Sequence, residues 1–503
     1  MKTVFVLLDS LNRNAMEPYG STSVHTPNFA RFAKRAVTFD NHYVGSLPCI
    51  PARRDLHTGR LNFLHRSWGP LEPFDDSFPE LLKTAGTYTH ITTDHHHYFA
   101  DGGGTYHQRF SSWELVRGQA IDRWKAYVNP DLDELRADHH PLQHHRVNYL
   151  QNRKHMVEEK DYCGPQVFAG GMEFLERNHD QDNWLLQLEC FDPHEPFHVP
   201  QRFRDMYPTD YDGPILEWPV YKRVTETPEE IAELRANYAA LTTMCDEYFG
   251  RLLDFFDAND MWKDTCLVLT TDHGFLLGEH DWWSKNRMPV YDEIARIPLL
   301  VYHPDHAAQG GTRRAALTQS IDLMPTILNL HDHAIPADVM GHSLLPLLEK
   351  DQRIRDTAIF GYFGAAMNIT DGRYVYHRYP EKLTADGLYE YTLMPTRMTS
   401  RFAISELVEA TLANPFDFTK GVPVLRVSPR ANAEGNVIEV QGMNFEDTQT
   451  RLYDLENDPK QDTPIVDPQI EARLLTALIE QMRAADAPEE LFDRFDLWGT
   501  PNA

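Results

Sequence analysis

Short, uninterrupted runs of apolar residues recur along this chain, and they are typical of buried parallel β-strands. Such strands are covered on both faces, so apolar and polar positions do not alternate along them. We expect strands of this kind at residues 4–8, 184–188, 266–271 and 297–302, with helices between them. The longest predicted helix covers residues 227–257 and starts with the favourable sequence Pro-Glu-Glu. The pattern predicts an α/β fold with a large, mostly parallel sheet sandwiched by helices.

The pattern changes after Asp356, where the apolar and aromatic segments become shorter. We therefore predict a first domain over residues 1–365 and a smaller C-terminal α+β domain with an antiparallel sheet over residues 366–503. Short strands are expected at 358–362, 374–376, 388–391 and 452–455, followed by a helix from about 468 to 484.

Composition limits the partners of the protein. The chain of 503 residues contains 48 Lys and Arg against 75 Asp and Glu, a formal net charge of -27. Nucleic acid and anionic membranes are repelled by such a surface, so we expect neither as a partner. An active site for an anionic substrate then needs a local concentration of positive charge, from a metal or from a few cationic side chains.

The cysteines and the first residues indicate a compartment. Five widely spaced cysteines without a C-x-x-C pair argue against a disulfide framework and favour a reducing environment. The apolar run at residues 4–8 is shorter than the roughly 7–15 residues of a signal-peptide core. No run reaches the roughly 20 apolar residues of a membrane span. These features predict a cytoplasmic protein.

Charged and polar residues follow three of the predicted strands. Asp9 comes after the first, Asp272-His273 after the third, and Asp192-Pro193-His194 after the second. The carboxyl ends of strands in open α/β sheets are where ligands bind. Two carboxylates there can hold calcium, magnesium or manganese, and an imidazole shifts the preference toward manganese, iron or zinc. A single aspartate at a strand end is more often a turn or cap residue, but two on separate strands favour a metal site.

A second motif, Cys49-Ile-Pro-Ala-Arg53 with Thr58-Gly-Arg60 behind it, points to anion chemistry. Cys49 is placed at a helix start, Pro51 lies just inside the helix, and Arg53 follows one turn later. A helix N-terminus offers free N–H donors to an oxyanion such as sulfate or phosphate. The alternative interpretation is a buried cysteine at a helix cap.

These motifs resemble those of the sulfatase family in the alkaline phosphatase superfamily, over most of the chain. The matching segments, in family order, are Val4–Asp9, His25–Phe29, Cys49–Arg53, Thr271–Gly274, Leu277–His280 with Lys285, Tyr291–Leu299, Ser320–Thr326 and Leu452–Pro459. The resemblance implies an arylsulfatase-like enzyme that hydrolyses sulfate esters, with a small-molecule or saccharide sulfate ester as substrate.

The resemblance also implies the cofactors. In the family, a maturation enzyme oxidises the motif cysteine to formylglycine, the catalytic nucleophile, so Cys49 is expected to be modified in this way. One divalent metal ion is expected on Asp9, Cys49, Asp272 and His273. Most sulfatases have a second aspartate where this chain has Ser10, and many have asparagine in place of His273. These departures leave the metal open, with calcium or manganese favoured.

Further catalytic residues follow from the same resemblance. Arg53 is expected to pair with the carboxylates of the site and to orient the nucleophile. His95 and His97 map onto a family K-x-H pattern, and in an extended segment both face the pocket while His96 points away. These two histidines and Lys285 offset charge on the transferring group. His194 or Lys285 protonates the leaving oxygen.

Two alternatives remain open at this stage. The same site can serve a phosphonate monoester or phosphodiester hydrolase, whose substrates also present one negative charge in tetrahedral geometry. A more distant alternative is a non-catalytic, anion-binding homologue in which Cys49 stays a thiol.

The alcohol part of the substrate and the oligomeric state are not predicted. As pocket walls we expect four tryptophans, Trp113, Trp124, Trp282 and Trp283.

Overall fold

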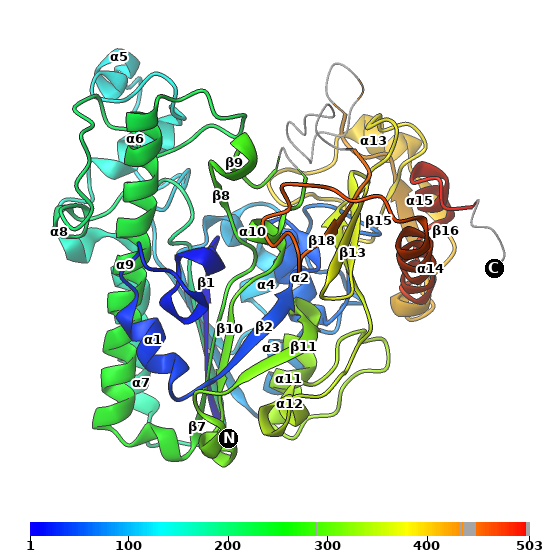
Figure 1. The fold of residues 1–503 in the computed structure, drawn as a ribbon, viewed down its shortest axis with the longest axis horizontal. Helices are drawn as coiled ribbons and strands as arrows, with labels where there is room; N and C mark the ends of the chain where they lie inside the picture. Colours follow the sequence, from blue (N-terminus) through cyan, green and yellow to red (C-terminus); the bar gives the residue numbers. More distant parts are fainter. Residues whose placement is uncertain (287–288, 432–434, 436–448, 499–503) are drawn as a thin grey trace.

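A computed structural model describes residues 1–286, 289–431, 435 and 449–498 of the chain. Its largest element is an eight-stranded sheet with the order β11-β2-β10-β7-β1-β6-β4-β5 (Figure 1). The strands are β1 (Lys2–Leu8), β2 (Val37–Tyr43), β4 (Tyr88–Thr93), β5 (Ser112–Leu115), β6 (Trp184–Cys190), β7 (Thr265–Thr270), β10 (Leu299–Tyr302) and β11 (Arg313–Gln319).

The centre of this sheet consists of the strands that the apolar runs predict. β1 lies between β6 and β7 and pairs in parallel with both. β10 is the exception, because it runs antiparallel to β7 and to β2. The predicted fold class, an α/β fold with a mostly parallel sheet, is confirmed. The direction of β10 was not predictable, since a buried apolar run has the same composition whichever way it runs.

Helices cover both faces of the sheet, as the side chains of β1 show. Val4, Val6 and Leu8 pack on one face with α1, α7 and α9, and Phe5 and Leu7 pack on the other with α2, α3, α11 and α12. This alternation of fully buried residues is what a sandwiched strand requires. The helix bounds are α1 Pro27–Ala33, α2 Cys49–Thr58, α3 Phe78–Thr84, α7 Cys163–Asn178, α9 Pro228–Ala258, α11 Leu323–Leu330 and α12 Leu345–Glu349.

The long helix α9 confirms the helix predicted at residues 227–257. It starts with a capping box, in which the Glu230 amide donates to Thr227 Oγ1 (3.3 Å) and the Thr227 amide donates to Glu230 Oε2 (2.7 Å). α9 runs along one side of the molecule (Figure 1). Although it has 31 residues, no helix in the described part of the chain is both long and apolar enough to span a membrane.

A second sheet, with the order β18-β14-β13-β12-β3, joins the C-terminal part of the chain to the segment before Cys49. The short strand β3 (Ser46–Leu47) pairs in parallel with β12, Ser46 opposite Gly361 and Leu47 opposite Tyr362. The other strands are antiparallel to one another: β12 (Ala358–Tyr362), β13 (Ala366–Thr370), β14 (Tyr374–Arg378) and β18 (Arg451–Asp454). The predicted division at residue 365 falls between β12 and β13, and it stays a prediction.

The remaining C-terminal elements pack beside this sheet. Helix α14 (Pro468–Ala484) confirms the predicted helix, and its Leu474 and Leu478 share a core with Ile369 of β13. A three-stranded antiparallel sheet contains β15 (Glu390–Thr392), β16 (Thr411–Ala413) and β17 (Val424–Val427). Helix α15 (Glu489–Arg494) lies next to α14 at the edge of the molecule (Figure 1).

Candidate active site

Cys49 is the first residue of α2 and is separated from β3 only by Pro48. Asp55 fixes this arrangement from within the helix, because its carboxylate accepts hydrogen bonds from Ser46 N (2.6 Å) and Ser46 Oγ (2.7 Å) and from Asn62 N (2.9 Å). The left-handed backbone of Gly59 (φ 64°) ends the helix, a conformation that glycine adopts without strain. The helix start is thus held rigidly between the two large sheets.

Arg53 lies one turn after Cys49 and pairs with three buried carboxylates. Its guanidinium donates to Asp9 Oδ2 (2.8 Å), to Asp272 Oδ2 (2.6 Å) and to Glu189 Oε1 (2.6 Å). It also donates to the Cys49 carbonyl (3.0 Å). All four side chains of the ion-pair cluster are essentially without solvent exposure. Arg53 therefore fixes the carboxylates relative to the start of α2.

Glu189 was missed by sequence reasoning. It is the sixth residue of β6, and its second oxygen accepts hydrogen bonds from Tyr98 Oη (3.0 Å) and Gln187 Nε2 (2.8 Å). A charged residue inside an otherwise apolar buried strand is the signal that marks it, since an ionised carboxylate is buried only when paired.

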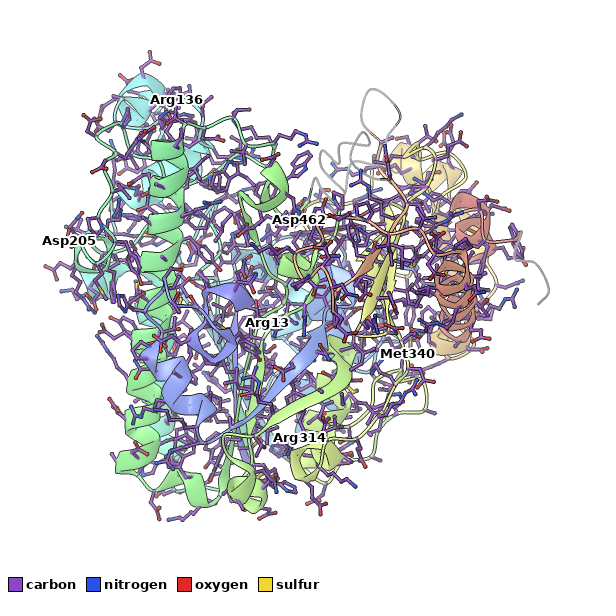
Figure 2. All side chains as sticks on the ribbon, in the orientation of Figure 1. Arg13, Arg136, Asp205, Arg314, Met340 and Asp462 are labelled. Atoms are coloured by element: carbon purple, nitrogen blue, oxygen red, sulfur yellow. The ribbon has the colours of Figure 1, made fainter. Side chains whose placement is uncertain are left out.

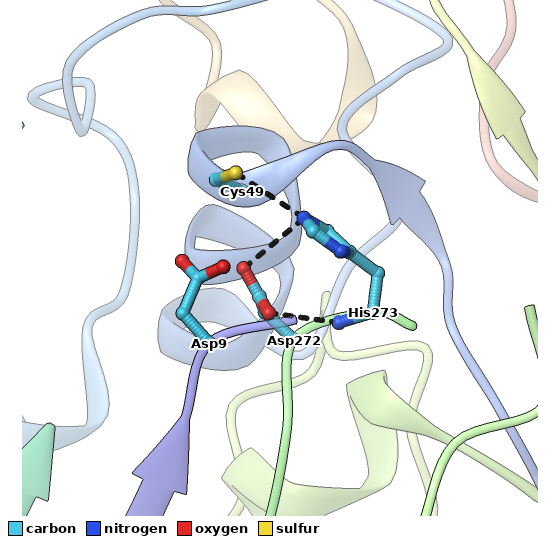
Figure 3. A group of neighbouring side chains, drawn as sticks. All are labelled: Asp9, Cys49, Asp272 and His273. Atoms are coloured by element: carbon cyan, nitrogen blue, oxygen red, sulfur yellow. Dashed lines mark hydrogen bonds and ion pairs between the residues drawn. The ribbon is translucent and has the colours of Figure 1, made fainter. Parts of the chain in front are cut away.

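Asp9, Cys49, Asp272 and His273 come together as a group able to hold a metal ion. One potential ligand atom of each lies within 4.8 Å of the others. Figure 3 shows them converging at the start of α2, from the ends of β1 and β7. Burial by itself raises the pKa of Asp9, but the charges of Arg53 and Lys285 outweigh it and hold that pKa well below its usual value. Asp9 is therefore an ionised, acceptor-only side chain.

The donor set fits a divalent cation. His273 Nδ1 lies 3.0 Å from the Gly274 carbonyl, which can only accept, so the proton of a neutral imidazole is on Nδ1 and Nε2 has a free lone pair. Nε2 lies 3.2 Å from Cys49 Sγ. The buried carboxylates of Asp9, Asp272 and Glu189 outnumber the cations Arg53 and Lys285 by one. A dication reverses the sign of this cluster, which favours binding of an anionic ester.

Lys285 occupies the other side of the site. Its Nζ donates to Ser10 Oγ (2.8 Å) and lies 3.9 Å from Asp9 Oδ1. Ser10 Oγ in turn donates to Asp9 Oδ1 (2.8 Å). Burial opposes the charge of Lys285, but the carboxylates of Glu195 and Asp9 raise the pKa of its ammonium. Ser10, which stands where most sulfatases have an aspartate, thus links the lysine to the first carboxylate.

The unmodified thiol of Cys49 is a poor nucleophile in this setting. Burial and the neighbouring Asp9 carboxylate raise the pKa of Cys49 well above its usual value, against the opposing effect of Lys285. Because the thiolate is the reactive form of cysteine, a protonated Cys49 does not support direct thiolate attack.

His194 lies in a buried pair with Glu195. His194 Nδ1 is 2.6 Å from the Glu195 carbonyl and 3.2 Å from Glu195 Oε2. Burial lowers the pKa of His194 well below its usual value, with a further contribution from Lys285. The hydroxyl of Tyr221 donates to Glu195 Oε1. Sequence reasoning missed Glu195 and Tyr221, although Glu195 directly follows His194 in the sequence.

The loop containing His194 is held from behind by a second pair of buried carboxyl groups. The side chain of Gln119 donates to Asp192 Oδ1 (2.8 Å) and to Asp94 Oδ2 (3.2 Å), and the Phe191 amide donates to Asp94 Oδ1 (2.7 Å). Burial raises the pKa of Asp192 to about 7. Asp94 thus fixes the backbone at Phe191, and Gln119 links the two carboxyl groups.

The histidines at 95–97 are arranged differently from the prediction. Residues His96–Phe99 form a 3₁₀ helix, so the alternation of an extended segment does not apply. His96 and His97 line the active-site cavity, and His95 does not. His95 is fully buried between Tyr98 and Phe191, at ring distances of 5.0 and 5.2 Å. The expectation that His96 points away from the pocket was wrong.

The active-site cavity has a volume of about 430 Å³, and Cys49, His194 and Lys285 are part of its lining. Its tryptophans are Trp68 and Trp218, not the four that were predicted. Trp283 is fully buried, and its indole N–H donates a hydrogen bond to Glu226 Oε2 (2.8 Å). Trp282 is also buried. Trp113 and Trp124 lie outside the lining. Closeness to Lys285 in sequence did not reveal which way these indoles turn.

Comparison with known proteins identifies the family. Residues 2–333 match the Sulfatase family, and residues 278–408 match "N-sulphoglucosamine sulphohydrolase, C-terminal". A curated relative, N-acetylglucosamine-6-O-sulfatase of Bacteroides thetaiotaomicron, is 25% identical over 72% of this chain and 74% of its own. The protein PehA of Trinickia caryophylli, described as a multifunctional alkaline phosphatase superfamily protein, is 27% identical over 64% of this chain and 71% of its own.

Solved structures share the fold at lower identity. BT4656, solved with its substrate D-glucosamine-2-N,6-O-disulfate, has a TM-score of 0.67 at 17% identity and covers 97% of this chain and 99% of its own. The phosphonate monoester hydrolase of Agrobacterium radiobacter has a TM-score of 0.64 at 19% identity, over 96% and 95% of the two chains. The predicted family and its reaction class, hydrolysis of sulfate esters, are confirmed, and the chain belongs to the sulfatase family.

Proposed function

We propose that this sulfatase acts on saccharide or similar cyclic sulfate esters, through a formylglycine derived from Cys49 and one divalent metal ion. The observation that supports this most strongly is the position of Cys49. Cys49 begins α2, it faces the imidazole of His273 and two carboxylates held by Arg53, and it lines a cavity together with Lys285. The saccharide class is suggested by relatives named for sulfated sugars and by the two tryptophans in the lining.

The formylglycine and the metal ion each have one role when present. A hydrated formylglycine supplies a nucleophilic oxygen, and a divalent cation on Asp9, Asp272, His273 and residue 49 supplies Lewis-acid charge. Everything else is done by the chain itself. Arg53 fixes the positions of the Asp9 and Asp272 carboxylates. The lone pair on His273 Nε2 faces residue 49. The ester binds with its anionic group toward this cluster and toward Lys285.

Two residues are available to protonate the leaving oxygen, and their hydrogen bonds distinguish them. The proton of a neutral His194 is held on Nδ1 by the Glu195 carbonyl, which leaves Nε2 as an acceptor. Lys285 is an ammonium in the cavity lining and has protons to donate. We assign proton donation to Lys285 and the positioning of the ester oxygens to His194, His97 and His96.

The experiment that tests this function has two parts. We expect mass spectrometry of the tryptic peptide containing Cys49, from protein matured with a formylglycine-generating enzyme, to show conversion of thiol to aldehyde. We then expect kcat/KM for an aryl sulfate to exceed that for the matching aryl phosphonate monoester. A higher kcat/KM for the phosphonate favours the phosphonate monoester hydrolase alternative, and an unmodified, inactive Cys49 favours the anion-binding scaffold.

Removal of the metal gives a further prediction. Treatment with a chelator is expected to abolish turnover and to lower the melting temperature, because buried carboxylates in negative excess are then left without their cation. Calcium and manganese are added back separately, and the ion that restores both activity and melting temperature identifies the native metal. Full activity of chelated, metal-free protein contradicts the assignment of Asp9, Asp272 and His273 as ligands.

A further inference from the structure

Three arginines line the active-site cavity in addition to Lys285, and they differ in how their charge is compensated. Arg397 pairs with Glu406 (2.9 Å) and lies 3.6 Å from Glu390, and the charge of Arg430 acts on the same Glu406. Arg146 has no ion-pair partner among residues 1–286, 289–431, 435 and 449–498. Arg146 therefore brings an uncompensated positive charge to the cavity lining of a chain whose net charge is -27.

The backbone of Arg146 is fixed to the cavity wall. Arg146 is the N-cap residue of α6 (Val147–Arg153), and the neighbouring His144 amide donates to the Trp218 carbonyl (3.1 Å). Tyr149 of α6 packs edge-on against Trp218, at a ring distance of 4.9 Å. Tyr149 and Trp218 share a core with Phe191, whose ring lies 4.0 Å from that of His194. These contacts fix the backbone of Arg146 relative to the catalytic residues.

The walls of the cavity suit a ring. Trp218 lies on the side of Arg146, next to His144 (5.6 Å between ring centres). Trp68 is the other tryptophan of the lining and packs edge-on against His97 (5.1 Å). Indole faces and edges form apolar surfaces for sugar or aromatic rings. A ring held here, with its ester at Cys49, presents its other substituents to the rest of the lining, which includes Arg146.

We propose that the preferred substrate is a cyclic sulfate ester with a second anionic substituent, and that Arg146 binds this substituent. The inference rests on the proposed function and specifies its substrate class. A guanidinium binds a sulfate or a carboxylate through two parallel hydrogen bonds, which a lysine cannot reproduce. The local charge of Arg146 also offsets the repulsion that a dianion meets from this acidic protein.

The test compares substrates that differ by one anionic group. For the matured enzyme, kcat/KM is measured on a hexosamine monosulfate, a hexosamine disulfate and a sulfated uronic acid, so that a second sulfate and a carboxylate are distinguished. We expect a preference of at least 10-fold for one of the two dianions. Arg146→Ala is expected to reduce this ratio by 10-fold or more, and Arg146→Lys to retain part of it.

Arg136→Ala is the matched control. Arg136 is an exposed arginine on α5 (Leu132–Arg136), labelled in Figure 2, and it lies outside the cavity lining, so its removal changes the net charge equally and is expected to leave the ratio unchanged. Equal kcat/KM for monoanion and dianion in the wild type overturns the inference. An equal loss on all substrates in Arg146→Ala overturns it as well.

Binding without turnover separates this inference from the proposed function. In the inactive Cys49→Ala background, calorimetry is expected to show that adding Arg146→Ala raises the Kd of the disulfate at least 10-fold. If no ester is hydrolysed by matured enzyme while this Arg146-dependent binding is observed, the proposed function fails and the binding site stands. If Cys49→Ala binds the disulfate with the same Kd with and without Arg146→Ala, the proposed binding site is refuted.

Discussion

Cys49→Ala is expected to lower kcat by about 10⁴-fold or more, to the limit of detection, with the fold intact. The substitution removes the atom from which the nucleophile is made, and none of the neighbouring groups replaces it. Its structural cost is small, because the Cys49 side chain makes one polar contact with the described residues, to His273, and the helix start is fixed by other residues. Aryl sulfate turnover and thermal unfolding of the same preparations measure the two effects.

Cys266→Ala provides the control for loss of a buried thiol. Cys266 is fully buried in β7, away from the cavity, and its sulfur contacts the Tyr302 carbonyl. We expect this variant to keep its activity and to lose about 1 to 2 kcal/mol of stability. Activity well above background in Cys49→Ala, from protein shown by mass spectrometry to be free of wild-type chain, contradicts the assignment of the nucleophile.

Arg53→Lys is expected to impair both activity and stability. A lysine has one ammonium on a flexible chain and does not hold three carboxylates in fixed directions as the guanidinium does. The uncompensated charges left in the buried cluster are expected to cost about 3–5 kcal/mol of unfolding free energy. Displacement of Asp9 and Asp272 is expected to lower kcat/KM by about 10²-fold or more.

Arg54→Lys is the matched control for this variant. Arg54 is the next residue of the same helix and is also buried and ion-paired, but its partner is Asp75 (2.8 Å), outside the catalytic cluster. We expect it to lose stability while kcat/KM stays near that of the wild type. Urea unfolding and aryl sulfate kinetics are measured on both variants. If both lower kcat/KM equally, Arg53 acts through general stability and not through the aspartates.

The sequence predicted those parts of the structure that depend on local pattern. Uninterrupted apolar runs identified β1, β6 and β7, and the polar residues just beyond them placed Asp9 and Asp272 at one edge of the sheet. The long helix α9 was predicted from its N-terminal capping residues. In each case the signal lies within a few residues of the element, so tertiary packing did not override it.

Side-chain direction over longer distances was not predictable. His96 reaches the cavity because a 3₁₀ helix replaces an extended strand, a change that the three consecutive histidines do not reveal. Trp68 and Trp218 both line the cavity, although they are 150 residues apart in the sequence. The contacts of the Glu195 carboxylate with Tyr221 and His194 were not predicted, because Tyr221 is 26 residues away in the sequence.

The pairing of β3 with β12 has a consequence for exchange of segments between homologous genes. Catalytic chemistry resides mainly in the first part of the chain, but the strand that immediately precedes Cys49 completes a sheet built from residues after 357. A chimera that joins the first part of this protein to the last part of a relative therefore changes the neighbour of that strand and, through it, the position of residue 49. We therefore expect the first and last parts of the chain to function best when both come from the same protein, and such chimeras to lose activity.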